Sequence, residues 1–229
     1  MACIINIETS TRVCSVALAV DGVTVFSEIS SEGPSHAVLL GVFVEKALKE
    51  VKLRGGMDAV AVSSGPGSYT GLRIGVSLAK GLCFGYGIPI IGISTLKIMA
   101  QAVIREHNKA TGIYYPMLDA RRMEVYSAMY DNEGREIRET KAEIITPDIL
   151  NDIPGDQTIY LLGDGAAKCK EVVNSPRVVI IDNVYPLAKD MSDLAEEAYK
   201  SGNVESAAYF EPFYLKEFQA TVGKNKVLG

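Results

Sequence analysis

Two acidic residues stand at the ends of apolar runs in corresponding parts of the two halves of the chain. Glu8 follows the run Cys3–Ile7, and Asp119 follows the run Ile113–Leu118. Proteins commonly hold Mg²⁺ through one or two carboxylates together with phosphate oxygens. If the two runs are equivalent strands, Glu8 and Asp119 face each other across a cleft, and Ser10 lies in the turn nearest the phosphates. The alternative is that both carboxylates are polar strand ends that face water.

The turns that follow these strands argue against working ATP chemistry. A turn that grips phosphate needs glycine or small residues, so that its backbone N–H groups can close on the anion. The turn after Glu8 carries small hydroxyl residues, but the turn after Asp119 carries Arg121 and Arg122, whose bulk hinders a close approach. We therefore predict a vestigial nucleotide cleft at Glu8, Ser10 and Asp119.

A glycine-rich segment, residues 65–71, reads Gly-Pro-Gly-Ser-Tyr-Thr-Gly and joins a predicted strand to a predicted helix. Glycines allow tight turning, and a helix N-terminus favours anions. The segment lacks the Gly-Lys-Ser/Thr that places a lysine on the β- and γ-phosphates. Of the two interpretations, a phosphate loop and a strand-to-helix turn with Thr70 as N-cap, the pattern favours the second.

Histidine and cysteine residues form no cluster at metal-ligand spacing. His36 and His107 are far apart, and the four cysteines lack a Cys-x-x-Cys pair and lie among apolar residues. No Gly-x-Ser-x-Gly occurs, and neither histidine has an obvious carboxylate partner. We predict no metal site and four buried, reduced thiols, and a metalloprotease or a nucleophilic hydrolase has no positive support.

Composition restricts the class of protein further. The 229 residues are 48% hydrophobic, with a net charge of −5 and no tryptophan. This is enough apolar material for a core, but a mildly acidic chain is a poor polyanion binder on its own. The tyrosines are not interleaved with basic residues in the sequence, so no stacking platform for nucleic acid is visible. No signal peptide and no membrane span are apparent, so we expect a cytoplasmic protein.

The order of predicted elements repeats once along the chain. In the first half we predict strands at Cys3–Ile7, Val13–Val20, Val23–Ile29, Ala59–Val62 and Ile88–Ile93, and helices from residue 35 to Lys52, at Gly71–Phe84 and at Thr95–Glu106. In the second half we predict strands at Ile113–Leu118, Glu124–Tyr130, Glu136–Ala142, Thr158–Leu162 and Val178–Ile181, and helices opening at Thr146, after Gly165 and at Leu187–Lys200.

This order predicts an α/β protein of the actin-like (ASKHA) class. Its two duplicated βββαβα-type lobes would carry mixed five-stranded sheets flanked by helices. The lobes are expected at residues 1–106 and 107–229, the second with a C-terminal helical segment. The alternative is a single α/β sheet with insertions.

Two early helices carry more apolar surface than one core contact requires. In the predicted helix Gly71–Phe84, one apolar face carries Leu72 and Val76 and a second carries Ile74, and a row of small residues includes Gly75. Two apolar faces imply burial on two sides of a helix. We predict an interface with another subunit at Val38, Leu39, Val42, Phe43, Leu72, Gly75, Val76 and Ala79. The alternative is that the second lobe or the C-terminal segment covers this surface.

Several segments resemble the TsaB (YeaZ) family. They are Ile7–Ser10 with Cys14–Ala17, Ser64–Gly75, Ala79–Leu82, Pro89–Leu96, Asp119–Arg121 with Glu124–Tyr126, and Pro212–Lys216. The resemblance covers most of the chain, and the segment Gly65–Gly75 is long and specific. The last segment, Phe218–Gly229, matches little of the family.

The resemblance implies an actin-like protein without its own catalysis. Such a protein forms a homodimer when alone and pairs through its first two helices with a catalytic paralogue, TsaD. An ATPase, TsaE, also joins the complex, which makes threonylcarbamoyladenosine in tRNA. The resemblance further implies that the isolated chain has no cofactor, that ATP or ADP and metal sit on the partner subunits, and that tRNA is reached only through the complex.

The resemblance also locates a difference from the catalytic paralogue. Aligning the paralogue's metal-binding His-x-x-x-His on this chain places Thr95 and Met99 at the histidine positions, so that centre is expected to be missing. Glu8 stands where many relatives carry Asp. The alternative function is an active actin-like ATPase or kinase that uses Glu8 and Asp119.

Overall fold

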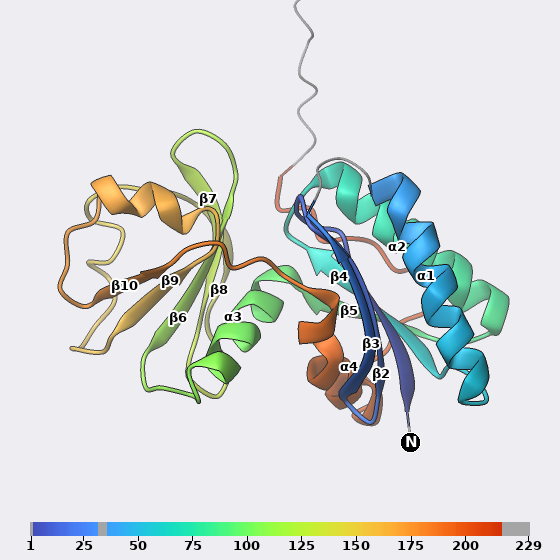
Figure 1. The fold of residues 1–229 in the computed structure, drawn as a ribbon. Coiled ribbons are helices and arrows are strands. Elements are labelled where there is room, and N and C mark those ends of the chain that lie inside the picture. Colours follow the sequence, from blue (N-terminus) through green and yellow to red (C-terminus); the bar gives the residue numbers. More distant parts are fainter. Residues whose placement is uncertain (1, 32–35, 217–229) are drawn as a thin grey trace, which may run out of the picture.

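Two five-stranded sheets of the same design form the framework of the molecule (Figure 1). The computed structural model describes residues 2–31 and 36–216. The first sheet has the order β3-β2-β1-β4-β5, and the second has the order β10-β9-β6-β7-β8. Their strands are β1 (Cys3–Glu8), β2 (Cys14–Val20), β3 (Val23–Ser30), β4 (Ala59–Gly65), β5 (Ile90–Ser94), β6 (Ile113–Asp119), β7 (Glu124–Tyr130), β8 (Glu136–Ile144), β9 (Ile159–Leu162) and β10 (Val178–Ile181).

The pairing in the two sheets corresponds strand by strand. β1 is antiparallel to β2 and parallel to β4, as β6 is antiparallel to β7 and parallel to β9. Asp21 and Gly22, with φ of 50° and 76°, form the tight turn between β2 and β3, since both adopt the left-handed conformation that such hairpins require. The predicted actin-like duplication is confirmed, and the single-sheet alternative is wrong.

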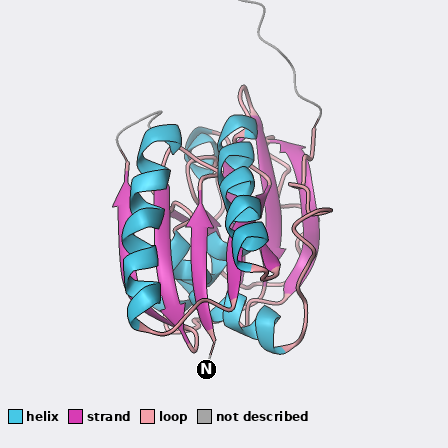
Figure 2. Cartoon of the chain, turned by 90° about the vertical axis from the view of Figure 1, so that its right-hand side faces the viewer, coloured by secondary structure: helices cyan, strands magenta, loops and turns pink. Residues whose placement is uncertain are grey.

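The helices lie in three places. α1 (His36–Leu53) and α2 (Tyr69–Tyr86) run side by side over the outer face of the first sheet (Figure 2). α3 (Thr95–Glu106) and α4 (Ser192–Lys200) lie between the two sheets (Figure 1). The short 3₁₀ helices are η1 (Ala166–Glu171) and η2 (Ala188–Met191). No helix among residues 2–31 and 36–216 is long and apolar enough to cross a bilayer.

α3 and α4 each pack on the sheet formed by the other half of the chain. Met99 and Val103 of α3 are buried against Tyr114 and Tyr130 of the second sheet. α4, with Leu194 and Ala195, is buried against β1, β4 and β5 of the first sheet. The predicted division at residues 106 and 107 falls between the strands of the two sheets, but these helices join both halves in one packed body.

Polar contacts reinforce the joint between the two halves, which is formed by α3 and α4. Arg105 of α3 forms ion pairs with Asp190 at 2.7 Å and Asp193 at 3.3 Å, and Gln101 donates to Asp193 at 2.9 Å. Burial of the Asp190 carboxyl raises its pKa, and Arg105 acts in the opposite direction. The joint therefore combines an apolar centre with a charged edge, which fixes the position of one sheet relative to the other.

Two helices predicted in the second half do not form as α-helices in the described residues. The segment after β8 forms turns over residues 147–152, because Asp148 and Asn151 bond to each other while Ile149 and Leu150 fill the core. The helix predicted after Gly165 is the short η1. The predicted helix at Leu187–Lys200 is found as η2 followed by α4. The predicted start of the first helix at residue 35 lies outside the described residues.

A C-terminal strap, residues 203–216, follows α4 and returns along the first sheet. Glu205 exchanges backbone hydrogen bonds with Ile90 of β5. The Phe210 ring is buried beside Gly92, where a Cβ atom would stand 2.7 Å from the ring. The Phe213 amide donates to the Ser64 carbonyl at the end of β4. The strap therefore runs along β5 from its first residue, Ile90, and reaches the carboxyl end of β4 at Ser64.

Candidate functional site: a closed phosphate turn and an open helix groove

The turn after β1 is fully enclosed by protein. Glu8, Thr9 and Ser10 are all buried. Glu8 Oε1 accepts a hydrogen bond from the Ser10 amide at 2.5 Å, and Oε2 has no hydrogen-bond partner among the described residues. Burial raises the pKa of Glu8 to about 7, although Ser10 and Ser63 lie close enough to oppose the shift. Glu8 is therefore a buried carboxyl group that is costly to ionise.

Glycines at the start of α2 enclose this turn. A Cβ atom on Gly71 would stand 2.0 Å from the Thr9 carbonyl oxygen, and one on Gly67 would stand 2.5 Å from the Ser10 carbonyl oxygen. The Thr9 hydroxyl donates to the Gly71 carbonyl at 2.8 Å, and the Ser68 amide donates to Ser10 at 2.6 Å. The glycines of this segment therefore leave room for the backbone of the turn after β1, which occupies the space that Cβ atoms would fill.

The N-cap of α2 differs from the prediction. Ser68, and not Thr70, caps the helix, and its hydroxyl accepts from the Gly71 amide at 3.2 Å. Thr70 is exposed within the first turn of the helix. The helix begins at Tyr69, two residues earlier than predicted, because the Ser68 hydroxyl accepts the Gly71 amide and so caps the helix at that point.

Asp119 lies in a different environment from Glu8. It ends β6 on the surface, where Lys168 Nζ stands 2.7 Å from its Oδ1. Glu8 is inside the first lobe, and no group of three His, Cys, Asp or Glu residues suited to a metal occurs in the described part of the chain. The prediction that Glu8 and Asp119 face each other across an open cleft is wrong, because packing of α2 against the turn shields Glu8. Ser10 is buried with it.

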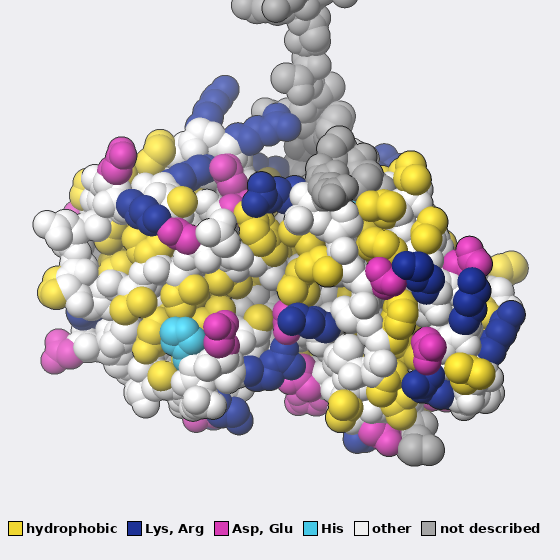
Figure 3. Space-filling model, viewed as in Figure 1, with side chains coloured by type: hydrophobic (Ala, Val, Ile, Leu, Met, Phe, Trp, Pro, Cys, Tyr) yellow, Lys and Arg dark blue, Asp and Glu magenta, His cyan; other side chains and the backbone are white. Residues whose placement is uncertain are grey.

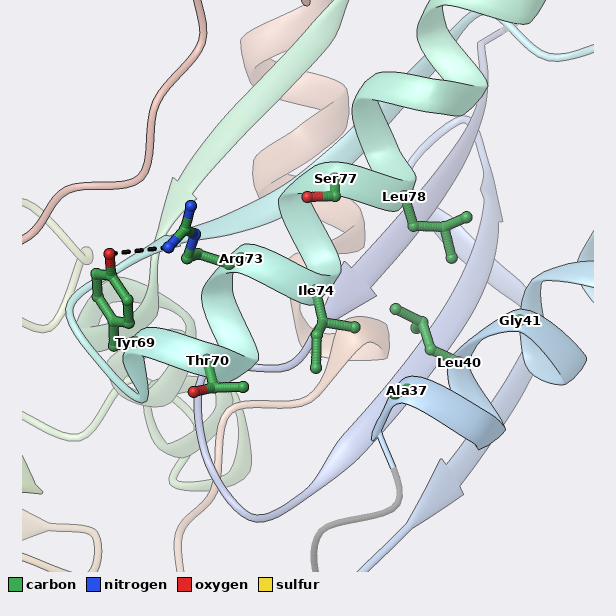
Figure 4. Close-up of a pocket in the computed structure, with 9 residues that line it drawn as sticks. All are labelled: Ala37, Leu40, Gly41, Tyr69, Thr70, Arg73, Ile74, Ser77 and Leu78. Carbon is green, nitrogen blue, oxygen red and sulfur yellow. Dashed lines mark hydrogen bonds between the residues drawn. The ribbon is translucent and has the colours of Figure 1, made fainter.

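An apolar groove runs between α1 and α2 on the outer face of the first lobe (Figure 4). Its volume is about 660 Å³. Ile74 and Leu78 of α2 point toward Leu40 of α1, and the Arg73 guanidinium donates to the Tyr69 hydroxyl at 3.0 Å at one end. The other residues along the groove are Ala37, Gly41, Thr70 and Ser77.

The eight residues predicted to meet a partner divide into two sets. Val38 and Val42 are 72% and 46% exposed, and Leu39 is half-buried, so these three remain candidates for contact. Four others belong to the core of the first lobe, and the prediction that they form an external surface is wrong. These four are Phe43, Leu72, Val76 and Ala79.

Gly75 is also unavailable to a partner. A Cβ atom there would stand 2.3 Å from the Thr9 hydroxyl oxygen, so its small size serves contact with the turn. The apolar face of α2 at Val76 packs in the core of the first lobe, and Leu72 on the same face lies beside Gly65 of β4. The second face, at Ile74, borders the groove.

One exposed apolar residue escaped the sequence analysis. Phe84, in the last turn of α2, is 90% exposed. It follows Arg73, Ser77 and Lys80 at helical spacing and therefore lies on the polar side of the helix. An aromatic residue on an otherwise polar stripe was the signal that could have identified it.

Comparisons with known proteins agree with this architecture. The chain is 33% identical to the tRNA threonylcarbamoyladenosine biosynthesis protein TsaB of Escherichia coli over 93% of this chain and 94% of that protein. The TsaB of Haemophilus influenzae is 30% identical, with 93% of each chain covered. This chain belongs to the TsaB (YeaZ) family. The model of a related family, described as TsaD: tRNA N6-adenosine threonylcarbamoyltransferase, matches residues 28–222.

Solved structures of the TsaB (YeaZ) family share the whole fold. YeaZ from Pseudomonas aeruginosa is 29% identical with a TM-score of 0.78, and the match covers 94% of this chain and 100% of that chain. A second P. aeruginosa structure, described as similar to peptidase YEAZ, gives a TM-score of 0.80 at 28% identity over the same shares of the two chains.

The two positions aligned with the paralogue's histidines lie in the interior of this TsaB-family chain. Thr95 begins α3 and is fully buried, and Met99 is buried between α3 and the second sheet. A Cβ atom on Gly163 would stand within 2.4 Å of the Met99 methyl group, so the space around Met99 is filled. Met99 is therefore packed in an apolar environment, and Thr95 is buried beside it at the start of α3.

The glycine contact can be tested on α2 itself. Gly75→Ala should lower the free energy of unfolding by roughly 1–3 kcal/mol, because the added methyl group overlaps the Thr9 side chain. The matched control is Gly81→Ala on the same helix, where nothing lies within 4 Å; it should raise stability by up to about 1 kcal/mol. Urea unfolding measures both, and equal effects of the two variants would contradict the described contact.

The buried carboxyl of Glu8 gives the stability a pH dependence of defined sign. Because its pKa is higher in the folded state, the unfolded chain loses this proton first as the pH rises above 4.5, and stability falls until about pH 7. The loss amounts to about 3 kcal/mol. Urea unfolding should show that Glu8→Gln has a higher free energy of unfolding than wild type at pH 8 but not at pH 5. An identical pH dependence in both proteins would refute the assignment.

Proposed function

We propose that this chain is a non-catalytic partner subunit in the synthesis of threonylcarbamoyladenosine in tRNA. In this proposal it pairs through α1 and α2 with a TsaD-like catalytic paralogue, and a TsaE-like ATPase completes the complex. ATP or ADP and metal bind to those partners. The observation that carries the proposal is that the turn after β1 is filled by α2, while the groove on the other side of α2 is open and apolar.

The enclosed turn supports the absence of catalysis in this chain. A phosphate-binding turn needs backbone N–H groups that point at the anion. Here the Ser10 amide bonds to Glu8 and the Val13 amide bonds to the Thr11 hydroxyl. Because Thr9 and Ser10 are buried under glycines, a phosphate group could reach the turn only if α2 moved away.

The outer surface of α1 and α2 supports pairing with a related subunit. Val38, Val42 and Phe84 expose large apolar side chains beside or beyond a groove whose walls include Ile74 and Leu78. Exposed apolar patches of this kind mark interaction sites on soluble proteins. In the absence of the paralogue, the same surface would pair with a second copy, which gives the homodimer expected of the isolated chain.

The pairing surface can be tested with charged substitutions. Val38→Asp/Val42→Asp should lower the apparent affinity for the catalytic paralogue at least tenfold, because two carboxylates would have to be desolvated. Size-exclusion chromatography measures this as a loss of co-elution. The homodimer should weaken in parallel. The control is Val179→Asp on β10 of the second sheet, where a similarly exposed valine is changed. Normal pairing by the α1 double variant would contradict the proposed surface.

The alternative, an active ATPase or kinase, makes a different prediction. It needs Mg-ATP to bind the isolated chain with micromolar affinity and needs Asp119→Ala to abolish that binding. We expect calorimetry to show no micromolar binding, because Glu8 is enclosed and Asp119 is paired with Lys168. Micromolar binding that disappears in Asp119→Ala would favour the enzyme.

A further inference from the structure

We propose that a rim of arginine and tyrosine side chains on this chain contacts the phosphate backbone of the tRNA substrate when the complex is assembled. The basic rim consists of Arg73, Arg121, Arg122, Tyr69 and Tyr214. It crosses from the first turns of α2 to the turn between β6 and β7. The inference rests on the proposed function, since it places the RNA of that reaction on a surface of this subunit.

The turn between β6 and β7 holds two arginines outward. Arg121 and Arg122 are exposed and have φ of 70° and 52°, a backbone conformation that residues other than glycine seldom adopt. The turn is closed by hydrogen bonds from the Arg121 amide to Asp119 Oδ1 at 2.6 Å and from the Ala120 amide to the Glu124 carbonyl at 3.1 Å. The backbone therefore presents both guanidinium groups on one fixed turn.

The acidic residues of this turn are already neutralised by lysines. Lys168 Nζ lies 2.7 Å from Asp119 and also donates to the Glu124 carbonyl, while Lys216 Nζ lies 2.5 Å from the Glu124 carboxylate. Neither Arg121 nor Arg122 forms an ion pair with any residue in the described ranges 2–31 and 36–216. Two arginines without an ion pair therefore lie beside two satisfied ion pairs, and the remaining carboxylate at the turn, Asp164, accepts from the Asp119 amide at 3.0 Å.

The C-terminal strap connects this turn to α2. Tyr214 packs on Tyr69 with ring centroids 4.9 Å apart, and the Arg73 guanidinium lies 5.2 Å from the Tyr69 ring. Two residues after Tyr214, Lys216 bonds to the turn at Glu124. Lys and Arg side chains gather along this upper edge of the molecule (Figure 3). Residues far apart in the sequence thus form one continuous basic and aromatic edge.

RNA is the ligand that this chemistry fits best. Guanidinium groups bind phosphate oxygens, and the Tyr214 ring, which is 40% exposed, offers a surface on which an unpaired base can stack. The protein as a whole has a net charge of −5, so the positive charge of this edge is opposite in sign to that of the whole protein. The sequence concealed the pattern, because Tyr69 and Arg73 are separated from Tyr214 by more than half of the chain and become neighbours only through the strap.

The test uses the assembled complex with the catalytic paralogue and an unmodified transcript of a substrate tRNA. Arg121→Ala/Arg122→Ala should weaken tRNA binding roughly tenfold, and the slope of log affinity against log salt should become shallower by about 1.5. The control is Lys109→Ala/Lys189→Ala, which removes the same charge from two exposed residues outside the rim, with Lys109 also in the left-handed conformation. The control should leave affinity and slope close to those of wild type. Fluorescence anisotropy at several salt concentrations measures all three proteins.

The outcomes separate this inference from the proposed function. Unchanged affinity and slope in Arg121→Ala/Arg122→Ala, or an equal loss in the control, would overturn the proposal that the basic rim contacts tRNA. Weaker pairing with the paralogue, with normal tRNA binding once the complex is saturated, would also overturn it and indicate an acidic protein surface as the occupant. If wild type does not pair with the paralogue, the proposed function fails. In that case the same tRNA is added to the isolated chain at low salt, where its weak binding must still depend on the two arginines. If it does not, the proposal that the basic rim contacts tRNA fails as well.

Discussion

The close approach of α2 to the turn after β1 is the contact on which the remaining architecture depends. Only a residue without a side chain can stand where Gly71 meets the Thr9 carbonyl, because a Cβ atom there would lie 2.0 Å from the oxygen. This contact places Gly71 in the first turn of α2, just after the Ser68 N-cap, encloses Glu8 and sets the side of α2 that faces the sheet. The opposite side of the helix then borders the groove with α1. One steric constraint therefore closes a potential ligand site and orients a potential docking surface.

The two halves of the molecule use the same topology for different purposes. In the first half the turn after β1 is closed by packing, whereas in the second half the turn after β6 stays at the surface and is stabilised by Lys168 and Asp119. Exchange of α3 and α4 between the sheets joins the halves, with Arg105 at the edge of the joint. A rigid body of this kind can present the α1–α2 surface and the basic rim in a fixed relation, which a subunit that positions others requires.

The sequence predicted the strands and the duplication well, because alternating and continuous apolar runs report directly on strand burial. The hairpin at Asp21 and Gly22 was equally visible, since a two-residue turn has a narrow chemical requirement. The site was harder to predict. Periodicity shows that α2 has two apolar faces but not which one meets the sheet, and the small row at Gly75 fits a partner helix as well as the Thr9 turn. The strap was invisible for another reason: Phe210 and Tyr214 act through contacts with residues more than a hundred positions away.

The central claim is that the turn after β1 is closed to ligands while the outer surface of α1 and α2 is free to bind a partner. Hydrogen–deuterium exchange on the full chain tests it most directly. The amides of residues 9–13 should exchange slowly in the isolated protein and should not change when Mg-ATP is added. Addition of the catalytic paralogue should protect residues 36–42 and 69–86 and leave the β10 region unchanged. Protection of residues 9–13 by Mg-ATP, with no change in α1 and α2 on addition of the paralogue, would contradict the account.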